Sequence, residues 1–161
     1  MGGRDDDSSD AGGRGEPVRV EAGKVAEVSF ASKKPRTDPF NEVTVDAVFT
    51  APDGATLRVP AFWAGGETWK VRYSSRTPGS HRFRTESRDA ADPALHGVEG
   101  AVEVVPYTGD DPLLIHGPLR VADDRRHFAY ADGTPFFWLG DTWWMGLTDR
   151  LAFPDDVRKL A

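Results

Sequence analysis

The chain has 161 residues and a mass of 17.6 kDa, enough for one domain and part of a second, and it is too short for a complete (β/α)₈ barrel of roughly 250 residues. Its 20 Lys and Arg residues against 26 Asp and Glu residues give a net charge of -6, which argues against nucleic acid and membrane surfaces as partners. A hydrophobic fraction of 39% predicts a soluble fold with a modest core, and the lack of cysteine excludes disulfides and thiolate chemistry.

Residues 1–16 are rich in Gly, Asp and Ser and hold no large apolar side chain after Met1, so we expect a disordered tail. No basic start followed by an apolar run is present, and no secretion signal can be read from this end. The cytoplasm is therefore the default compartment, and a location outside it stays open.

Residues 17–106 alternate apolar and polar side chains with a period of two, the pattern of half-buried strands. The turn sequence Pro-Asp-Gly at residues 52–54 joins two such runs, the second expected over 57–61. The pattern predicts six strands, or seven if residues 18–20 pair separately, with no helix among them. The expected fold is mainly β, a sandwich of two sheets.

Residues 107–118 hold two prolines and two glycines, the composition of a linker. Residues 119–161 then change pattern: short strand-like pieces precede Phe136–Leu139, which is apolar on both faces, as in a parallel strand covered by helices. Pro154 with adjacent acids predicts the start of a helix. A single strand–loop–helix unit cannot bury its own strand, so we expect a fragment of a larger domain that self-associates through the exposed strand.

The candidate binding residues are Asp141, Trp143 and Trp144. If Phe136–Leu139 is the first strand of a (β/α)₈ barrel, they lie at its C-terminal rim, where such barrels place their active sites. A carboxylate accepts hydrogen bonds from sugar hydroxyls, and an indole ring packs on the apolar face of a sugar. The alternative stays open that Asp141 caps the turn and the tryptophans only fill space.

Other side chains carry weaker signals. No carboxylate pair suited to glycosidic cleavage can be assembled, so we assign no catalytic residue. The histidines lack the spacing of metal ligands, so we expect neither a metal nor another cofactor, and His81 is expected to pack in the core. Trp63 and Trp69 are candidates for an aromatic platform that binds a glycan, with core packing as the alternative.

Two known families resemble parts of this sequence. The N-terminal immunoglobulin-like domain of unknown function that precedes many bacterial glycoside hydrolases is similar to the runs DPFNEVTVDAVFTAPDG and VPAFWAGGETWKVRYSSRTPGS. The opening of the apiosidase-like glycoside hydrolase domain is similar to HFAYADGTPFFWLGDTWWMGLTDRL. The resemblance implies an immunoglobulin-like or fibronectin-III-like sandwich followed by the first β/α unit of a truncated TIM barrel.

The resemblance also implies a function. It suggests the N-terminal part of a glycoside hydrolase that acts on complex polysaccharides, made of an accessory sandwich and an incomplete barrel that is inactive alone. Its partner would be an oligo- or polysaccharide. Of the family's pocket residues, only Asp141, Trp143 and Trp144 have counterparts here, at positions that contact substrate. The alternative is a non-catalytic sandwich that binds a carbohydrate or a protein, so whether the chain is an enzyme stays open.

Overall fold

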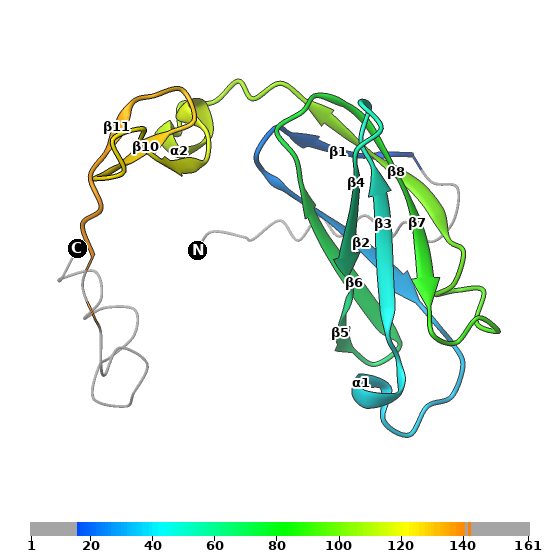
Figure 1. Ribbon diagram of the computed structural model, residues 1–161. Helices are drawn as coiled ribbons and strands as arrows, with labels where there is room; N and C mark the ends of the chain where they lie inside the picture. The colour runs from blue at the N-terminus through cyan, green and yellow to red at the C-terminus, as the bar shows by residue number, and fades with distance from the viewer. Residues whose placement is uncertain (1–15, 141, 143–161) are drawn as a thin grey trace, which may run out of the picture. The chain divides into compact units, whose positions relative to one another are not determined.

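The computed structural model describes residues 16–140 and residue 142 (Figure 1). The chain divides into two compact units, the first running to Gly117 and the second from Pro118 onward. Apart from Glu16, the expected disordered tail lies outside the described residues, and so does the helix expected from Pro154. None of the described helices is long and apolar enough to cross a membrane.

The first unit is a β-sandwich of two sheets (Figure 1). The larger sheet has the order β1-β8-β7-β3-β4, with bounds β1 (Val18–Glu21), β8 (Glu99–Val105), β7 (Gly79–Ser87), β3 (Val45–Thr50) and β4 (Thr56–Pro60). The smaller sheet has the order β2-β6-β5, with bounds β2 (Val25–Ala31), β6 (Thr68–Ser74) and β5 (Phe62–Gly65). The predicted mainly-β sandwich is confirmed.

The first and last strands of the sandwich lie side by side. β1 pairs with β8 in the parallel direction, with Val18 opposite Val102 and Val20 opposite Val104. β8 pairs on its other edge with β7, in the antiparallel direction. The strand that ends the sandwich therefore connects its first strand to the rest of the larger sheet.

The structure differs from the sequence prediction in two places. The strand expected over 57–61 is β4, but it ends at Pro60, whose nitrogen cannot donate to a ladder, and an additional strand, β5, begins at Phe62 in the other sheet. The described sandwich therefore has eight strands, five in one sheet and three in the other, where six or seven were predicted. A short helix, α1 (Pro39–Glu42), stands between β2 and β3, where no helix was predicted. Its start is fixed by Asp38, whose carboxylate accepts from the backbone N–H of Asn41 at 3.3 Å.

The core lies between the two sheets and contains a cluster of aromatic rings. Phe49 stacks on Tyr73 with 3.9 Å between ring centroids, and Phe83 lies 5.3 Å from Phe49. Each large apolar side chain buried in this way contributes roughly 1.5–3 kcal/mol. The other buried apolar side chains come from both sheets and their loops: Ala22, Ala26, Val28, Phe30, Val45, Ala47, Trp69, Val71, Leu95, Val102 and Val104.

His81 is fully buried in this core, which confirms its predicted position. Its Nε2 lies 2.8 Å from the carbonyl oxygen of Thr77, and its Nδ1 lies 2.7 Å from the hydroxyl of Tyr73. Because a carbonyl oxygen can only accept, Nε2 carries the ring proton and Nδ1 accepts from Tyr73. Both ring nitrogens are thus satisfied without water.

A second buried polar group joins two loops at one end of the sandwich. The carboxylate of Asp92 accepts from the hydroxyl of Ser32 at 2.6 Å and from the guanidinium of Arg36 at 2.7 Å. The Arg36 guanidinium also lies 6.0 Å from the ring of Trp69, within the range of a cation–π contact. These contacts hold the β2–β3 loop against the β7–β8 loop.

The residues expected to form a linker pack against the sandwich. The backbone N–H and the hydroxyl of Thr108 both donate to a carboxylate oxygen of Glu21, at 3.2 and 2.9 Å. Farther along, Arg76 donates to the carbonyl of Leu114 at 2.8 Å, within the short helix α2 (Pro112–His116). Side chains from the end of β1 and from the β6–β7 loop therefore hold this segment in place.

The second unit contains a three-stranded antiparallel sheet of order β11-β10-β9. Its strands are β9 (Leu119–Val121), β10 (Phe128–Tyr130) and β11 (Pro135–Phe136). The described residues contain no barrel, and the rest of the expected β/α unit lies outside them.

The buried parallel strand expected over Phe136–Leu139 is not formed in the described residues. Only Phe136 belongs to a strand, β11, which is antiparallel to β10. Phe137, Trp138 and Leu139 are 83%, 67% and 84% exposed. A strand that is apolar on both faces needs a layer on each side, and the described part of the second unit supplies neither.

Candidate functional site

The three binding residues predicted from the sequence, Asp141, Trp143 and Trp144, lie outside the described residues. Their contact with a substrate stays a prediction. The described residues that precede them, Phe137–Leu139, present apolar side chains to solvent.

The aromatic platform considered for Trp63 and Trp69 is not formed. The two residues are cross-strand neighbours on β5 and β6, but Trp69 is only 3% exposed because it packs in the core of the sandwich. Trp63 lies on the edge strand and is 37% exposed, with its indole N–H donating to the carbonyl of Gly66 at 3.0 Å. Trp69 therefore belongs to the core, the alternative that the sequence left open.

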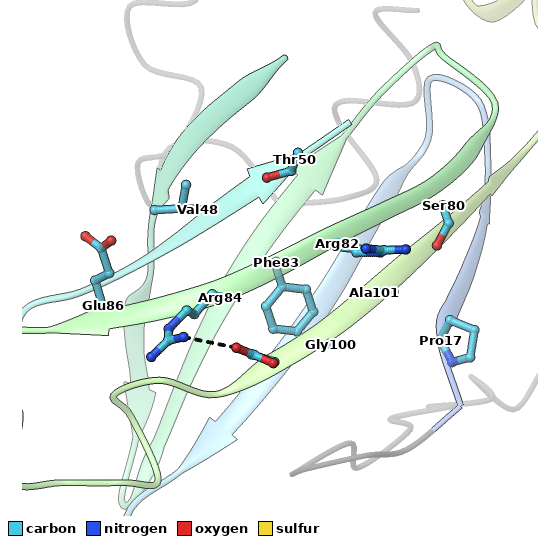
Figure 2. A pocket seen from close by; sticks show the side chains of 11 residues that line it. Pro17, Val48, Thr50, Ser80, Arg82, Phe83, Arg84, Glu86, Gly100 and Ala101 are labelled. Carbon is cyan, nitrogen blue, oxygen red and sulfur yellow. Dashed lines mark hydrogen bonds and ion pairs between the residues drawn. The ribbon is translucent and has the colours of Figure 1, made fainter. Parts of the chain in front are cut away.

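The structure instead shows a pocket of about 700 Å³ on the outer face of the larger sheet (Figure 2). We call it the outer-face pocket. Its lining comes from three neighbouring strands and the residue before β1: Pro17, Val48, Thr50, Ser80, Arg82, Phe83, Arg84, Glu86, Glu99, Gly100 and Ala101. Its volume falls within the range of small-ligand sites, about 300–1,000 Å³.

Strand β7 supplies the centre of this pocket. Its side chains alternate strictly, so Arg82, Arg84 and Glu86 are exposed while His81 and Phe83 are buried. This alternation can be read from the sequence, but the sequence does not reveal which residues of β3 and β8 stand opposite. The pocket was missed for that reason.

The floor of the pocket depends on a glycine. Gly100 on β8 stands opposite Phe83, and a Cβ added to Gly100 would lie 2.5 Å from Cζ of Phe83. The Phe83 ring occupies the space that a side chain would take, so an inward-facing residue also lines the outer face (Figure 2). Val48 and Ala101 extend this apolar floor.

The rim of the pocket is charged, and its acids are already paired. Arg84 contacts Glu99 at 3.1 Å, the ion pair drawn in Figure 2. Glu86 contacts Arg58 of β4 at 2.6 Å. Hydrogen bonds to Glu86 and then Asp46 raise the pKa of Arg58 above its ordinary value.

This arrangement suits binding rather than bond cleavage. Both pocket carboxylates, Glu86 and Glu99, accept hydrogen bonds from arginines, whereas a general acid must carry a proton to donate. Within the described residues, no group of three His, Asp or Glu side chains is placed to hold a metal ion. The outer-face pocket combines an apolar floor with a polar rim, the composition of a ligand site.

Both parts of the chain match known families. Residues 19–88 match DUF5060, a domain of unknown function, and residues 122–158 match the family described as Apiosidase-like, catalytic domain. A search of curated proteins finds no match.

A solved structure matches both in sequence and in fold. The crystal structure of a candidate glycoside hydrolase from Bacteroides vulgatus is 28% identical to this chain, with a TM-score of 0.61 over 74% of it. The chain spans only 21% of that protein's length. As the sequence resemblance predicted, this chain is similar to a DUF5060 domain followed by the start of an apiosidase-like catalytic domain, and to a candidate glycoside hydrolase of known structure.

Proposed function

We propose that this chain is the N-terminal part of a glycoside hydrolase that acts on an oligo- or polysaccharide, with the sandwich as an accessory domain. The observation that carries the proposal is the order of the two family matches, together with the similarity to a candidate glycoside hydrolase of which the chain spans 21%. In this proposal residues 17–106 form the accessory sandwich, residues 107–118 connect it, and residues 119–161 begin the catalytic barrel.

The exposed apolar segment supports this division. Phe137, Trp138 and Leu139 are exposed in the described structure, although such side chains are normally buried. In a complete barrel, a first strand is covered by helices outside and by packed side chains inside. The proposal gives these three residues the cover that they lack here.

The proposal assigns binding and no catalysis to this chain. Asp141 would accept hydrogen bonds from sugar hydroxyls, and Trp143 and Trp144 would pack against the sugar ring at the rim of the barrel. The proton-transferring carboxylates would come from barrel strands beyond this chain, so the chain alone would not cleave a glycosidic bond.

The test is to sequence the genomic DNA through the codon for Ala161 and to assay any longer product. Release of reducing sugar from a panel of plant polysaccharides is measured for the longer product and for this chain. We expect activity from the longer product only, and a loss of affinity for substrate when its Asp141 is replaced by Asn. Hydrolysis by this chain alone would overturn the proposal, and so would a stop codon directly after Ala161.

The second candidate function is a binding module without catalysis. The outer-face pocket favours it, because a sheet that only braced a barrel would need no hollow lined by arginines. In this case the chain would bind an oligosaccharide, and the longer product would show binding with no release of sugar.

A further inference from the structure

The two outward arginines of β7 have different cross-strand neighbours. Arg84 stands between Val48 of β3 and Glu99 of β8, and it contacts that glutamate at 3.1 Å. Arg82 stands between Thr50 and Ala101, which carry no charge. The register of the sheet therefore neutralises one arginine and leaves the other without an opposing acid.

No ion pair forms at Arg82 in the part of the chain that the structure describes. A third arginine on the same face, Arg58 of β4, contacts both Asp46 at 3.0 Å and Glu86 at 2.6 Å. Arg82 is exposed, lines the outer-face pocket, and stands there without a dashed contact in Figure 2. Its guanidinium is free to bind a carboxylate through two parallel N–H donors.

The surroundings of Arg82 are suited to a sugar ring. The Phe83 ring, Val48 and Ala101 provide an apolar surface against which the C–H face of a sugar can pack. Thr50 and Ser80 add hydroxyl groups that can donate to or accept from sugar hydroxyls. A ligand with a carboxylate on a sugar ring would use all three features together.

We propose that the outer-face pocket binds a carbohydrate that carries a carboxylate, a uronic acid unit, with Arg82 as the group that pairs with the carboxylate. The choice of a carbohydrate rests on the proposed function, whereas the carboxylate rests on the register of the sheet around Arg82. The pocket is a second carbohydrate site, on the sandwich and separate in sequence from Asp141, Trp143 and Trp144.

The test is a titration of the ¹⁵N-labelled chain, followed by its amide resonances. The probes are a tetramer of galacturonate, a neutral tetramer of glucose, and a tetramer of glutamate, which carries carboxylates without a sugar. We expect the galacturonate tetramer to shift the resonances of Thr50, Arg82 and Ala101 and to bind about tenfold more tightly than either other probe. Raising the salt concentration should weaken that binding, because the pair at Arg82 is exposed.

Two variants separate a specific contact from general charge. Arg82→Gln should weaken binding of the galacturonate tetramer by about fivefold to tenfold. Arg88→Gln removes the same charge from an exposed arginine outside the pocket and should leave binding unchanged. Arg82→Lys keeps the charge without the planar fork and should fall between the two.

Equal binding of the galacturonate and glucose tetramers, or unchanged binding by Arg82→Gln, would overturn the role of Arg82. Equal binding of the glutamate tetramer would overturn the carbohydrate. Because the titration involves no hydrolysis, each of these results leaves the glycoside hydrolase proposal standing. That proposal fails separately, through the reading frame and the sugar-release assay.

Discussion

Arg36 and Asp92 form an ion pair of 2.7 Å with 7% and 4% of their side chains exposed. The aspartate also accepts from the hydroxyl of Ser32 and from the backbone N–H of Ala94, so its oxygens are well satisfied. The pair joins loops that are distant in sequence. The pair matters because a buried charge that loses its partner is costly.

Replacing Asp92 by Asn should therefore destabilise the sandwich. The buried guanidinium of Arg36 would keep only its longer ion pair, with Asp89 at 3.3 Å, so we expect a loss of about 3 kcal/mol in the free energy of unfolding. Urea denaturation of the wild-type chain and the variant measures this loss. Asp53→Asn, in an exposed turn, is the control, and an equal loss in both variants would contradict the role of the buried pair.

The same aspartate should make stability fall in acid. Burial has the largest single effect on Asp92 and raises its pKa, but the hydrogen bonds from Ser32, Arg36 and Ala94 together outweigh burial and hold the pKa below the ordinary 3.8. Its contribution is therefore complete above pH 3.8 and is lost as the pH falls through the lower folded-state value. Urea titrations from about pH 6 to about pH 2 should show a shallower decline for Asp92→Asn.

Gly100 should tolerate no side chain. A methyl group there would lie 2.5 Å from the Phe83 ring, which is packed against Phe49 and cannot withdraw, so Gly100→Ala should cost about 1–3 kcal/mol. Thermal unfolding checks this value. Ala101→Ser adds one atom on the outer face of the same strand and should change stability by less than about 0.5 kcal/mol. A larger effect at residue 101 than at residue 100 would contradict the packing argument.

Removing the Tyr73 hydroxyl should expose the dependence of the core on His81. Tyr73→Phe leaves Nδ1 of His81 buried without a donor, which should cost about 1–3 kcal/mol. The cost should be smaller when His81 is already replaced by Leu, because no orphaned nitrogen remains. Additive losses in the double variant would show that the two groups do not interact.

Glu21→Ala should loosen the segment that follows the sandwich. The N–H of Thr108 donates to Glu21 at 3.2 Å, so its hydrogen exchange should become faster once the carboxylate is removed. Glu27→Ala, which breaks ion pairs to Lys70 and Arg72 on the smaller sheet, is the matched control. Equal acceleration at Thr108 in both variants would rule out a local role for Glu21.

The exposed apolar segment should cause self-association. Trp138 lies between Phe137 and Leu139, all largely exposed, and contiguous apolar surface of this kind promotes association. The wild-type chain should sediment as larger species as its concentration rises. At the same concentrations, Trp138→Ser should sediment more as a monomer. Phe40→Ser, at an isolated aromatic that is 70% exposed, should not. A wild-type chain that stays monomeric at all concentrations would contradict this prediction.

The sandwich could be predicted from sequence because its signal is local. Alternation along β7 placed His81 and Phe83 inward and Arg82 outward, as the structure has them. The helix α1 was missed because its four residues carry no helical period; the signal was the cap formed by Asp38 and Pro39. A capping residue followed by proline can therefore start a short helix between two strands, even where the strand pattern continues on both sides.

The outer-face pocket could not be predicted, because it depends on cross-strand register. Sequence alternation shows that Arg82 and Arg84 face the same way, but only pairing shows that one meets Glu99 and the other Ala101. The missing side chain of Gly100 opens the pocket floor only because the Phe83 ring stands opposite it. The predicted site at Asp141, Trp143 and Trp144 lies beyond the described residues, so it remains a sequence-based prediction.

The parallel pairing of β1 with β8 has a consequence for how the chain acquires its structure during synthesis. β1 leaves the ribosome first, but its partner is the last strand of the sandwich to emerge. Closing a contact across so much chain is slow, whereas the β3–β4 and β3–β7 pairs form within shorter stretches. Until β8 arrives, β1 and one edge of β7 are open to pairing with other nascent chains, so this domain is most vulnerable to misassembly just before its translation is complete.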